Sequence, residues 1–288
     1  MPSPYFILFE LIIYIQLALC LRHAWGHGTS NLLRLLAGIL FGISLELASI
    51  RQLNAYEYGQ FIVMILDVPL CIGVAWSCIL YASMEFSDGS SLPYFARPVL
   101  DGLLALNIDL ALDAVAIRFG FWNWGQGLEF QYFGVPYANF WAWFWVVFFF
   151  SLGWRLLARR KDWLGTWASP LLAVCIGLAG VLGSNALIAF RIPFAYHGLT
   201  AAALLAFAFT FVIILRPRLS IKPLPSLTFW IPALSHFYIL IAGLAAGVIL
   251  NPPFLLFMGI VMIIFSLSLH LPAIKRSVFT SQRNTGQT

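Results

Sequence analysis

The sequence contains very few charged residues. Only 9% of its 288 residues are Asp, Glu, Lys or Arg, whereas soluble domains carry about 25%. So few charges cannot cover a surface that faces water, which excludes an ordinary soluble domain. Hydrophobic residues make up 61% of the chain, and the mean hydropathy is +0.91. The composition therefore predicts an all-α, polytopic transmembrane helix bundle, and the net charge of +5 bears on membrane orientation and not on nucleic-acid binding.

Several chemical signatures are also missing. The four cysteines form no Cys-x-x-Cys pair, which argues against a structural metal site or a disulfide framework. The five histidines do not supply the clustered ligands of a di-iron oxygenase. The chain has no glycine-rich phosphate loop, no serine nucleophile elbow and no dinucleotide fingerprint. We therefore expect neither a bound metal nor another cofactor.

Nine segments are apolar and long enough to cross a membrane, which takes about 20 residues. They lie approximately at 4–21, 32–50, 61–84, 98–117, 137–157, 168–189, 198–215, 230–249 and 254–271. The turn at Asn251-Pro252-Pro253 between the last two leaves eight full spans as an alternative. The first segment lacks the basic region of a signal peptide, so we interpret it as a retained helix. Residues 1–274 are thus predicted to form one transmembrane domain, and residues 275–288 a polar cytoplasmic tail.

The basic residues predict the orientation of the bundle. Thirteen of the sixteen Lys and Arg residues fall in the odd-numbered connections and the C-terminal tail. Only Arg51, Arg118 and Arg191 fall in the even-numbered connections. By the positive-inside rule, the N-terminus is predicted to lie outside and the C-terminus in the cytoplasm, with the protein in the cytoplasmic membrane.

The fourth span carries three acidic residues, Asp101, Asp109 and Asp113. Each charged residue at mid-helix costs about 2.5–3.5 kcal/mol on the insertion scale, so this helix should not face lipid. At about 100° per residue, the three positions share one face of the helix, which must then point into the bundle. Burial favours the neutral form of a carboxyl group, and a neutral Asp in an apolar pocket is what acid catalysis on a hydrocarbon needs.

Further acidic residues should lie in the same layer of the membrane. Glu46 and Asp67 are predicted near the outer ends of the second and third spans, at the level of Asp109 and Asp113. These carboxylates could instead pair with Arg51, with Arg118 or with a tyrosine hydroxyl and only fix the packing of the helices. Both interpretations remain open at the level of the sequence.

Aromatic residues are concentrated in residues 119–145, which read FGFWNWGQGLEFQYFGVPYANFWAWFW. Many aromatic residues in membrane proteins form interfacial belts, but this stretch is denser than a belt requires. Its glycines and Pro136 break any helix in the first part. A non-helical aromatic segment beside the acidic helix end is typical of the wall or lid of a pocket for an apolar ligand.

The chain resembles the bacterial and archaeal carotenoid biosynthesis proteins whose characterised members are carotenoid 1′,2′-hydratases, of the bisanhydrobacterioruberin hydratase type. The matching pieces are Glu46, Tyr56-Glu57-Tyr58, Val68-Pro69-Leu70, Ala75-Trp76, Leu112-Asp113, Gly120-Phe121-Trp122-Asn123-Trp124, Tyr132-Phe133-Gly134-Val135-Pro136 and Asn139-Phe140-Trp141-Ala142-Trp143-Phe144. The resemblance covers roughly residues 46–145. Ser49, Leu53, Asn54, Ala114 and Ala142 depart from the family pattern.

The resemblance implies cofactor-free hydration of a terminal double bond in an acyclic carotenoid. In this hypothesis Asp113, or Asp109 one turn away, is the acid that protonates the bond, and Glu46 positions water or acts as its base. The substrate-binding residues are predicted to be Tyr56, Tyr58, Asp67, Trp122, Trp124, Tyr132, Asn139 and Trp143. The expected partners are a carotenoid or another long apolar isoprenoid and the membrane lipid, whereas the oligomeric state is undetermined.

Two other functions fit parts of the sequence. The spacing Asp109-x-x-x-Asp113 matches one aspartate motif of UbiA-type prenyltransferases, which are also nine-helical, but a second such motif for Mg²⁺ and diphosphate is missing. A non-catalytic membrane protein that binds or transports carotenoids or lipids is the other alternative. It predicts that Asp109 and Asp113 can be replaced without loss of ligand binding.

Overall fold

A computed structural model describes residues 3–53, 56–160, 162–218 and 224–285, with the backbone alone at 52–53 and 272–285. Within these residues the chain forms nine α-helices joined by short connections, with only four two-residue strands. The helices are α1 (Pro4–His27), α2 (Thr29–Leu53), α3 (Leu70–Asp88), α4 (Arg97–Phe119), α5 (Tyr137–Arg155), α6 (Trp163–Arg191), α7 (His197–Ile214), α8 (Leu227–Ala245) and α9 (Pro253–Thr285). The strands are β1 (Glu57–Tyr58), β2 (Met64–Ile65), β3 (Val68–Pro69) and β4 (Trp122–Asn123). The predicted all-α membrane bundle is confirmed.

Seven of the described helices are long and apolar enough to cross a membrane. The other two are α4, which carries three aspartates, and α5, which is rich in tryptophan. Both α4 and α5 pack inside the bundle, α4 against α3, α5, α8 and α9. The last two predicted spans are separate helices, α8 and α9.

The third helix starts later than predicted, at Leu70 and not near residue 61. Pro69 occupies the N-cap position in an extended conformation, and a proline disfavours helical conformation in the residue before it. Residues 61–69 instead lie outside the helix and include β2 and β3, which pair as a small antiparallel hairpin. This apolar segment is therefore a connection between helices and not part of a membrane span.

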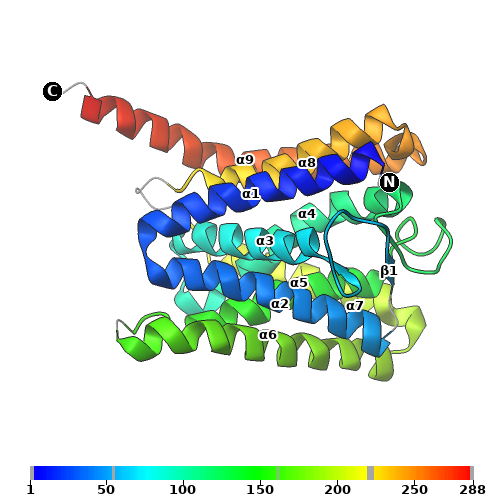
Figure 1. Cartoon of the computed structure of the whole chain (residues 1–288), viewed down its shortest axis with the longest axis horizontal. Helices are drawn as coiled ribbons and strands as arrows, with labels where there is room; N and C mark the ends of the chain where they lie inside the picture. The colour runs from blue at the N-terminus through cyan, green and yellow to red at the C-terminus, as the bar shows by residue number, and fades with distance from the viewer. Residues whose placement is uncertain (1–2, 54–55, 161, 219–223, 286–288) are drawn as a thin grey trace.

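The helices run alternately up and down, so that α1 begins at one end of the bundle and α9 finishes at the other (Figure 1). Residues 56–69 and 120–136 connect helices at the end that also holds the N-terminus, and we call this the capped end (Figure 1). There β1 and β4 pair antiparallel, with Tyr58 opposite Trp122, and the amide of Gly59 donates to the Phe121 carbonyl at 2.9 Å. Two segments more than 60 residues apart in the sequence are thus tied into one cap.

The opposite end of the bundle contains a buried ion network centred on Arg155. The Arg155 guanidinium pairs with Asp88 and, at 3.1 Å, with Asp101, and it also donates to the Ser151 and Ser87 hydroxyls. The side chains of Arg155 and Asp101 are only 4% and 0% exposed. Asp101 therefore lies on the predicted inward face of α4, but it forms an ion pair far from the capped end.

Close packing between α5 and α6 depends on Gly153. A Cβ atom at this position would lie 2.7 Å from the Leu172 carbonyl oxygen and 3.0 Å from the Ala173 Cα atom. We expect Gly153→Ala to lower the free energy of unfolding by about 1–3 kcal/mol, because the two backbones would have to separate. Denaturant titration in mixed micelles measures the change. Gly183→Ala on α6 is the matched control, since nothing lies within 4 Å of its Cβ position; equal losses in both variants would contradict the packing argument.

Candidate active site

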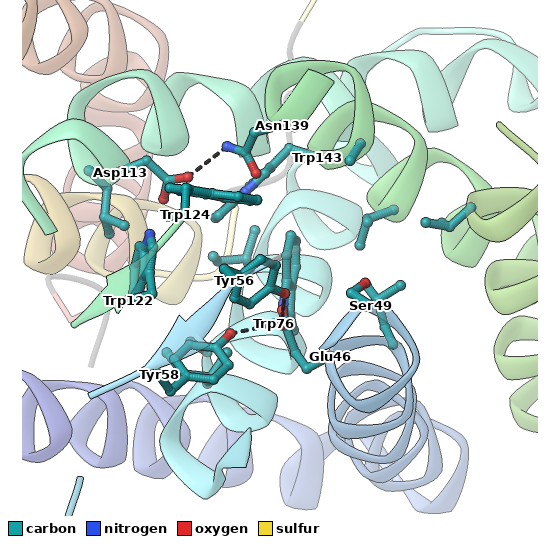
Figure 2. A pocket seen from close by; sticks show the side chains of 18 of the residues that line it. Glu46, Ser49, Tyr56, Tyr58, Trp76, Asp113, Trp122, Trp124, Asn139 and Trp143 are labelled. Atoms are coloured by element: carbon teal, nitrogen blue, oxygen red, sulfur yellow. Dashed lines mark hydrogen bonds between the residues drawn. The ribbon is translucent and has the colours of Figure 1, made fainter. Parts of the chain in front are cut away.

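A large apolar cavity opens inside the capped end of the bundle, and its volume is about 210 Å³. Its walls come from α1 to α6, from α8 and from the two connections of the cap. The polar side chains that line it are Gln16, Glu46, Ser49, Tyr56, Tyr58, Asp113, Asn139, Asn185 and Ser235, with the indoles of Trp76, Trp122, Trp124 and Trp143. Figure 2 shows how most of these side chains converge from different elements. The cavity is thus an apolar chamber with a small number of polar groups in its wall.

Glu46 on α2 is held by three hydrogen-bond donors. Its carboxylate accepts hydrogen bonds from the Tyr56 hydroxyl, from the Tyr58 hydroxyl at 2.7 Å and from the Trp76 indole at 2.6 Å. Burial and the Glu46 charge raise the pKa of both phenols well above their ordinary value, so the tyrosines remain protonated donors. Three donors on one carboxyl group favour its charged form. The cap therefore supplies two of the three donors that hydrogen-bond to Glu46.

Asp109 and Asp113 lie one turn apart on α4 and share the amide of Asn139 on α5. The Asn139 amide donates to Asp113 at 2.6 Å and to the two oxygens of Asp109 at 3.4 and 3.3 Å. Asp113 lines the cavity, whereas Asp109 is fully buried behind it. The second oxygen of Asp113 is buried and has no hydrogen-bond partner among the described residues. One oxygen of this carboxyl pair is thus buried without a hydrogen-bond partner among the described residues.

Four indoles and two phenols surround the space between the two carboxyl sites. The rings of Trp76 and Trp143 lie 4.3 Å apart between centroids, and those of Tyr56 and Trp124 lie 4.6 Å apart in a T-shaped pair. Figure 2 shows Tyr56 and Trp124 between Glu46 on one side and Asp113 with Asn139 on the other. An apolar ligand in this space would face aromatic rings on several sides.

The structure brings together most of the residues that the sequence singled out. Eight of the eleven line the cavity, namely Glu46, Tyr56, Tyr58, Asp113, Trp122, Trp124, Asn139 and Trp143. Asp109 lies behind the wall. Asp67 lies elsewhere, because it precedes α3 in the connection and forms an exposed ion pair with Arg51 at 2.9 Å. Tyr132 also lies outside the cavity: its hydroxyl donates to the Leu110 carbonyl at 3.0 Å, and its ring packs on Phe140.

Trp76, Gln16 and Asn185 are among the wall residues that were not singled out from the sequence as parts of a site. Trp76 belongs to the resemblance motif but reads as a belt tryptophan, and its contact with Glu46 depends on how α2 packs against α3. Gln16 and Asn185 are isolated amides in otherwise apolar spans, and such amides are a signal that can be found by inspection. The oxygens of both amides are buried without a partner among the described residues.

Within the described part of the chain, no group of three or more His, Cys, Asp or Glu side chains is arranged to hold a metal ion. His23 and His27 are four residues apart on α1, and their rings stack with centroids 4.0 Å apart. His23 hydrogen-bonds Tyr81 at 2.8 Å, and the Nδ1 atom of His27 lies 2.8 Å from the His23 carbonyl oxygen. The two histidines are thus engaged in local contacts away from the cavity.

Comparison with known proteins identifies a family for most of the chain. The family described as carotenoid biosynthesis protein matches residues 3–213. No curated protein and no solved structure matches the chain. The matched region contains every residue that lines the cavity except Ser235, so the site lies almost wholly within the part of the chain that the family covers.

Proposed function

This chain belongs to the carotenoid biosynthesis protein family, and from that membership we propose that it hydrates the terminal C-1′,2′ double bond of an acyclic carotenoid end group. The reaction adds one water across the double bond and yields a tertiary alcohol. Hydration changes no oxidation state overall, so the residues of the chain itself have to supply only acid, base and a place for water.

The size and character of the cavity support an end group as its ligand. An engineered apolar cavity of about 150 Å³ holds benzene, so a cavity of about 210 Å³ takes an isoprenoid chain end. A whole carotenoid is about as long as the hydrocarbon core is thick, roughly 30 Å, and does not fit inside. The rest of the polyene then lies outside the cavity, in the apolar membrane.

The observation that carries the proposal is the pair of buried carboxyl groups of Asp109 and Asp113, of which Asp113 lies in the wall of an apolar cavity. Two carboxyl groups one helical turn apart in such a site are expected to hold a proton between them, because both cannot be ionised side by side. The Asn139 amide donates to one oxygen of Asp113 and to both oxygens of Asp109, which fixes the pair in place. Asp113 is then the acid that donates its proton to C-2′ of the double bond, and the positive charge develops on C-1′, which bears two methyl groups.

The aromatic wall and Glu46 suit the second half of the reaction. The faces of indole rings attract a cation, and Trp76, Trp124 and Trp143 surround the space where the charge develops. A water molecule then adds to C-1′ and releases a proton. Glu46, whose three hydrogen-bond donors oppose the effect of burial on its charged form, accepts that proton in the proposed mechanism.

Expression in a host that accumulates an acyclic carotene tests the proposal. With lycopene or γ-carotene as substrate, we expect pigments heavier by one water in extracts analysed by mass spectrometry. A carotene with rings at both ends is the control and should remain unchanged, because it has no terminal double bond of this kind. Unchanged lycopene in cells that contain the correctly inserted protein would refute the hydratase.

The same experiment separates the second candidate function, a carotenoid-binding protein without catalysis. The apolar cavity favours this function as well, since a chamber lined by indoles binds a polyene end whether or not it reacts. A binding protein should carry unmodified carotene through purification in detergent. Its binding should also survive replacement of Asp113 and Asp109.

A further inference from the structure

The floor of the cavity contains a polar group that the acid, the base and the aromatic wall do not use. Gln16 on α1 is 0% exposed and lines the cavity. Its Nε2 atom donates to the Ile231 carbonyl at 3.1 Å and to the Ser235 hydroxyl at 3.0 Å. A carbonyl oxygen can only accept, so the nitrogen of the amide must face α8. Its Oε1 atom is the free end, and this atom is buried without a partner among the described residues.

Gln16 lies deeper in the bundle than the carboxyl groups. Both hydrogens of its amide are used by α8, so the Oε1 atom is fixed in place as an acceptor. At a rise of about 1.5 Å per residue, Gln16 lies roughly 18 Å along α1 from Pro4 at the capped end. By the same measure Asp113 lies only about 9 Å along α4 from Phe119 at that end. The cavity therefore extends deeper into the bundle than Asp113, as far as Gln16.

This order along the cavity matches the order of atoms in a chain end. An end group that lies in the cavity with its terminus pointing away from the cap carries C-1′ deeper than C-2′. The acid then lies at the level of C-2′, and the deeper space lies beyond C-1′. Water has to approach C-1′ from a side that the polyene does not occupy, which is the side of Gln16.

We propose that Gln16 is a water-binding residue, which holds the reacting water on the floor of the cavity beneath C-1′; this inference rests on the proposed hydration. The water donates one hydrogen to Gln16 Oε1 and directs a lone pair at C-1′. The Asp113 O–H bond breaks as the π pair forms the C-2′–H bond, and the water oxygen then bonds to C-1′. The added water then releases a proton, which passes to the Glu46 carboxylate nearer the capped end, and return of a proton to Asp113 closes the cycle.

The proposal predicts a change in the fate of the carbocation. Without a held water, the cation returns a proton from C-2′ to the Asp113 carboxylate and regenerates the double bond. In heavy water this return leaves deuterium in the recovered carotene. For Gln16→Leu, which keeps the volume but removes the acceptor, we expect hydration to fall at least about tenfold while deuterium still enters the unreacted carotene. The ratio of exchange to hydration therefore rises.

The experiment uses membranes that contain the full chain, an acyclic carotene and buffer in D₂O, with mass spectrometry of both product and recovered substrate. Gln126→Leu is the matched control, because it makes the same amide-to-leucine change at an exposed position in the connection between α4 and α5; its ratio of exchange to hydration should stay at the wild-type value. An unchanged ratio in Gln16→Leu overturns the inference alone, as does loss of both reactions in a folded Gln16→Leu variant. A wild-type protein that neither hydrates nor exchanges refutes the proposed function, and the inference falls with it.

Discussion

Replacement of Asp113 by asparagine is expected to abolish the hydrated product while the protein stays folded. The variant keeps the size and the hydrogen-bonding reach of the side chain but has no acidic proton to give to C-2′. General acid catalysis contributes about 10²–10⁴-fold, so product formation should fall by at least two orders of magnitude. Pigment analysis of cells that express equal amounts of inserted wild type and variant measures the loss.

Two further variants test whether the loss is specific to the carboxyl pair. Glu129→Gln makes the same acid-to-amide change at an exposed position in the connection between α4 and α5, and it should leave product formation unchanged. Asp109→Asn removes the partner that shares the Asn139 amide with Asp113. Normal turnover in both Asp113→Asn and Asp109→Asn would remove the carboxyl pair from the mechanism and favour the binding protein.

Replacement of Arg155 by methionine is expected to cause the largest loss of stability. Methionine keeps an unbranched apolar stem, but Asp101 then remains buried at 0% exposure without its cation. Removal of one partner from a buried ion pair typically costs about 3–5 kcal/mol. The free energy of unfolding in mixed micelles should fall by this amount. Pigment binding at the capped end should fall only in proportion to the loss of folded protein.

A second substitution tests the cause of that loss. In the double variant Arg155→Met with Asp101→Asn, no carboxyl group is left buried without a cation at this site, so part of the lost stability should return. The exposed pair of Arg160 and Asp162, with side chains about half exposed, provides the comparison. Arg160→Met should change stability by less than about 1 kcal/mol, because exposed ion pairs contribute little. A loss of similar size in both arginine variants would contradict the role of burial.

The fold could be predicted from composition because long apolar segments in lipid satisfy their backbone hydrogen bonds by forming helices. Spans were identifiable by their length, and the three aspartates of α4 showed that this helix is interior. The start of α3 was missed because hydropathy does not distinguish an apolar hairpin from a helix, and the proline that decides between them acts through one backbone position. Helix boundaries depend on such local contacts more than on average composition.

The candidate site was less accessible from the sequence. Helical periodicity places Asp109 and Asp113 on one face of α4, but it cannot say that Asn139 meets them from α5. It also cannot separate Asp67, which pairs with Arg51 at the surface, from Glu46, which three donors surround. The packing of helices decides which polar groups share a cavity, and Gln16 in particular joins the site only because α1 lies against α8.

The small volume of the cavity has a kinetic consequence for substrates with two acyclic ends. Only one chain end fits inside, and the polyene between the ends is far too long to turn round within the bundle. Under the proposed function, the second end is reached only after the molecule leaves, diffuses in the bilayer and returns reversed. The enzyme is then distributive and not processive, so the singly hydrated carotenoid is an obligatory free intermediate. Another membrane enzyme that acts on the new alcohol can therefore intercept that intermediate before its other end is hydrated.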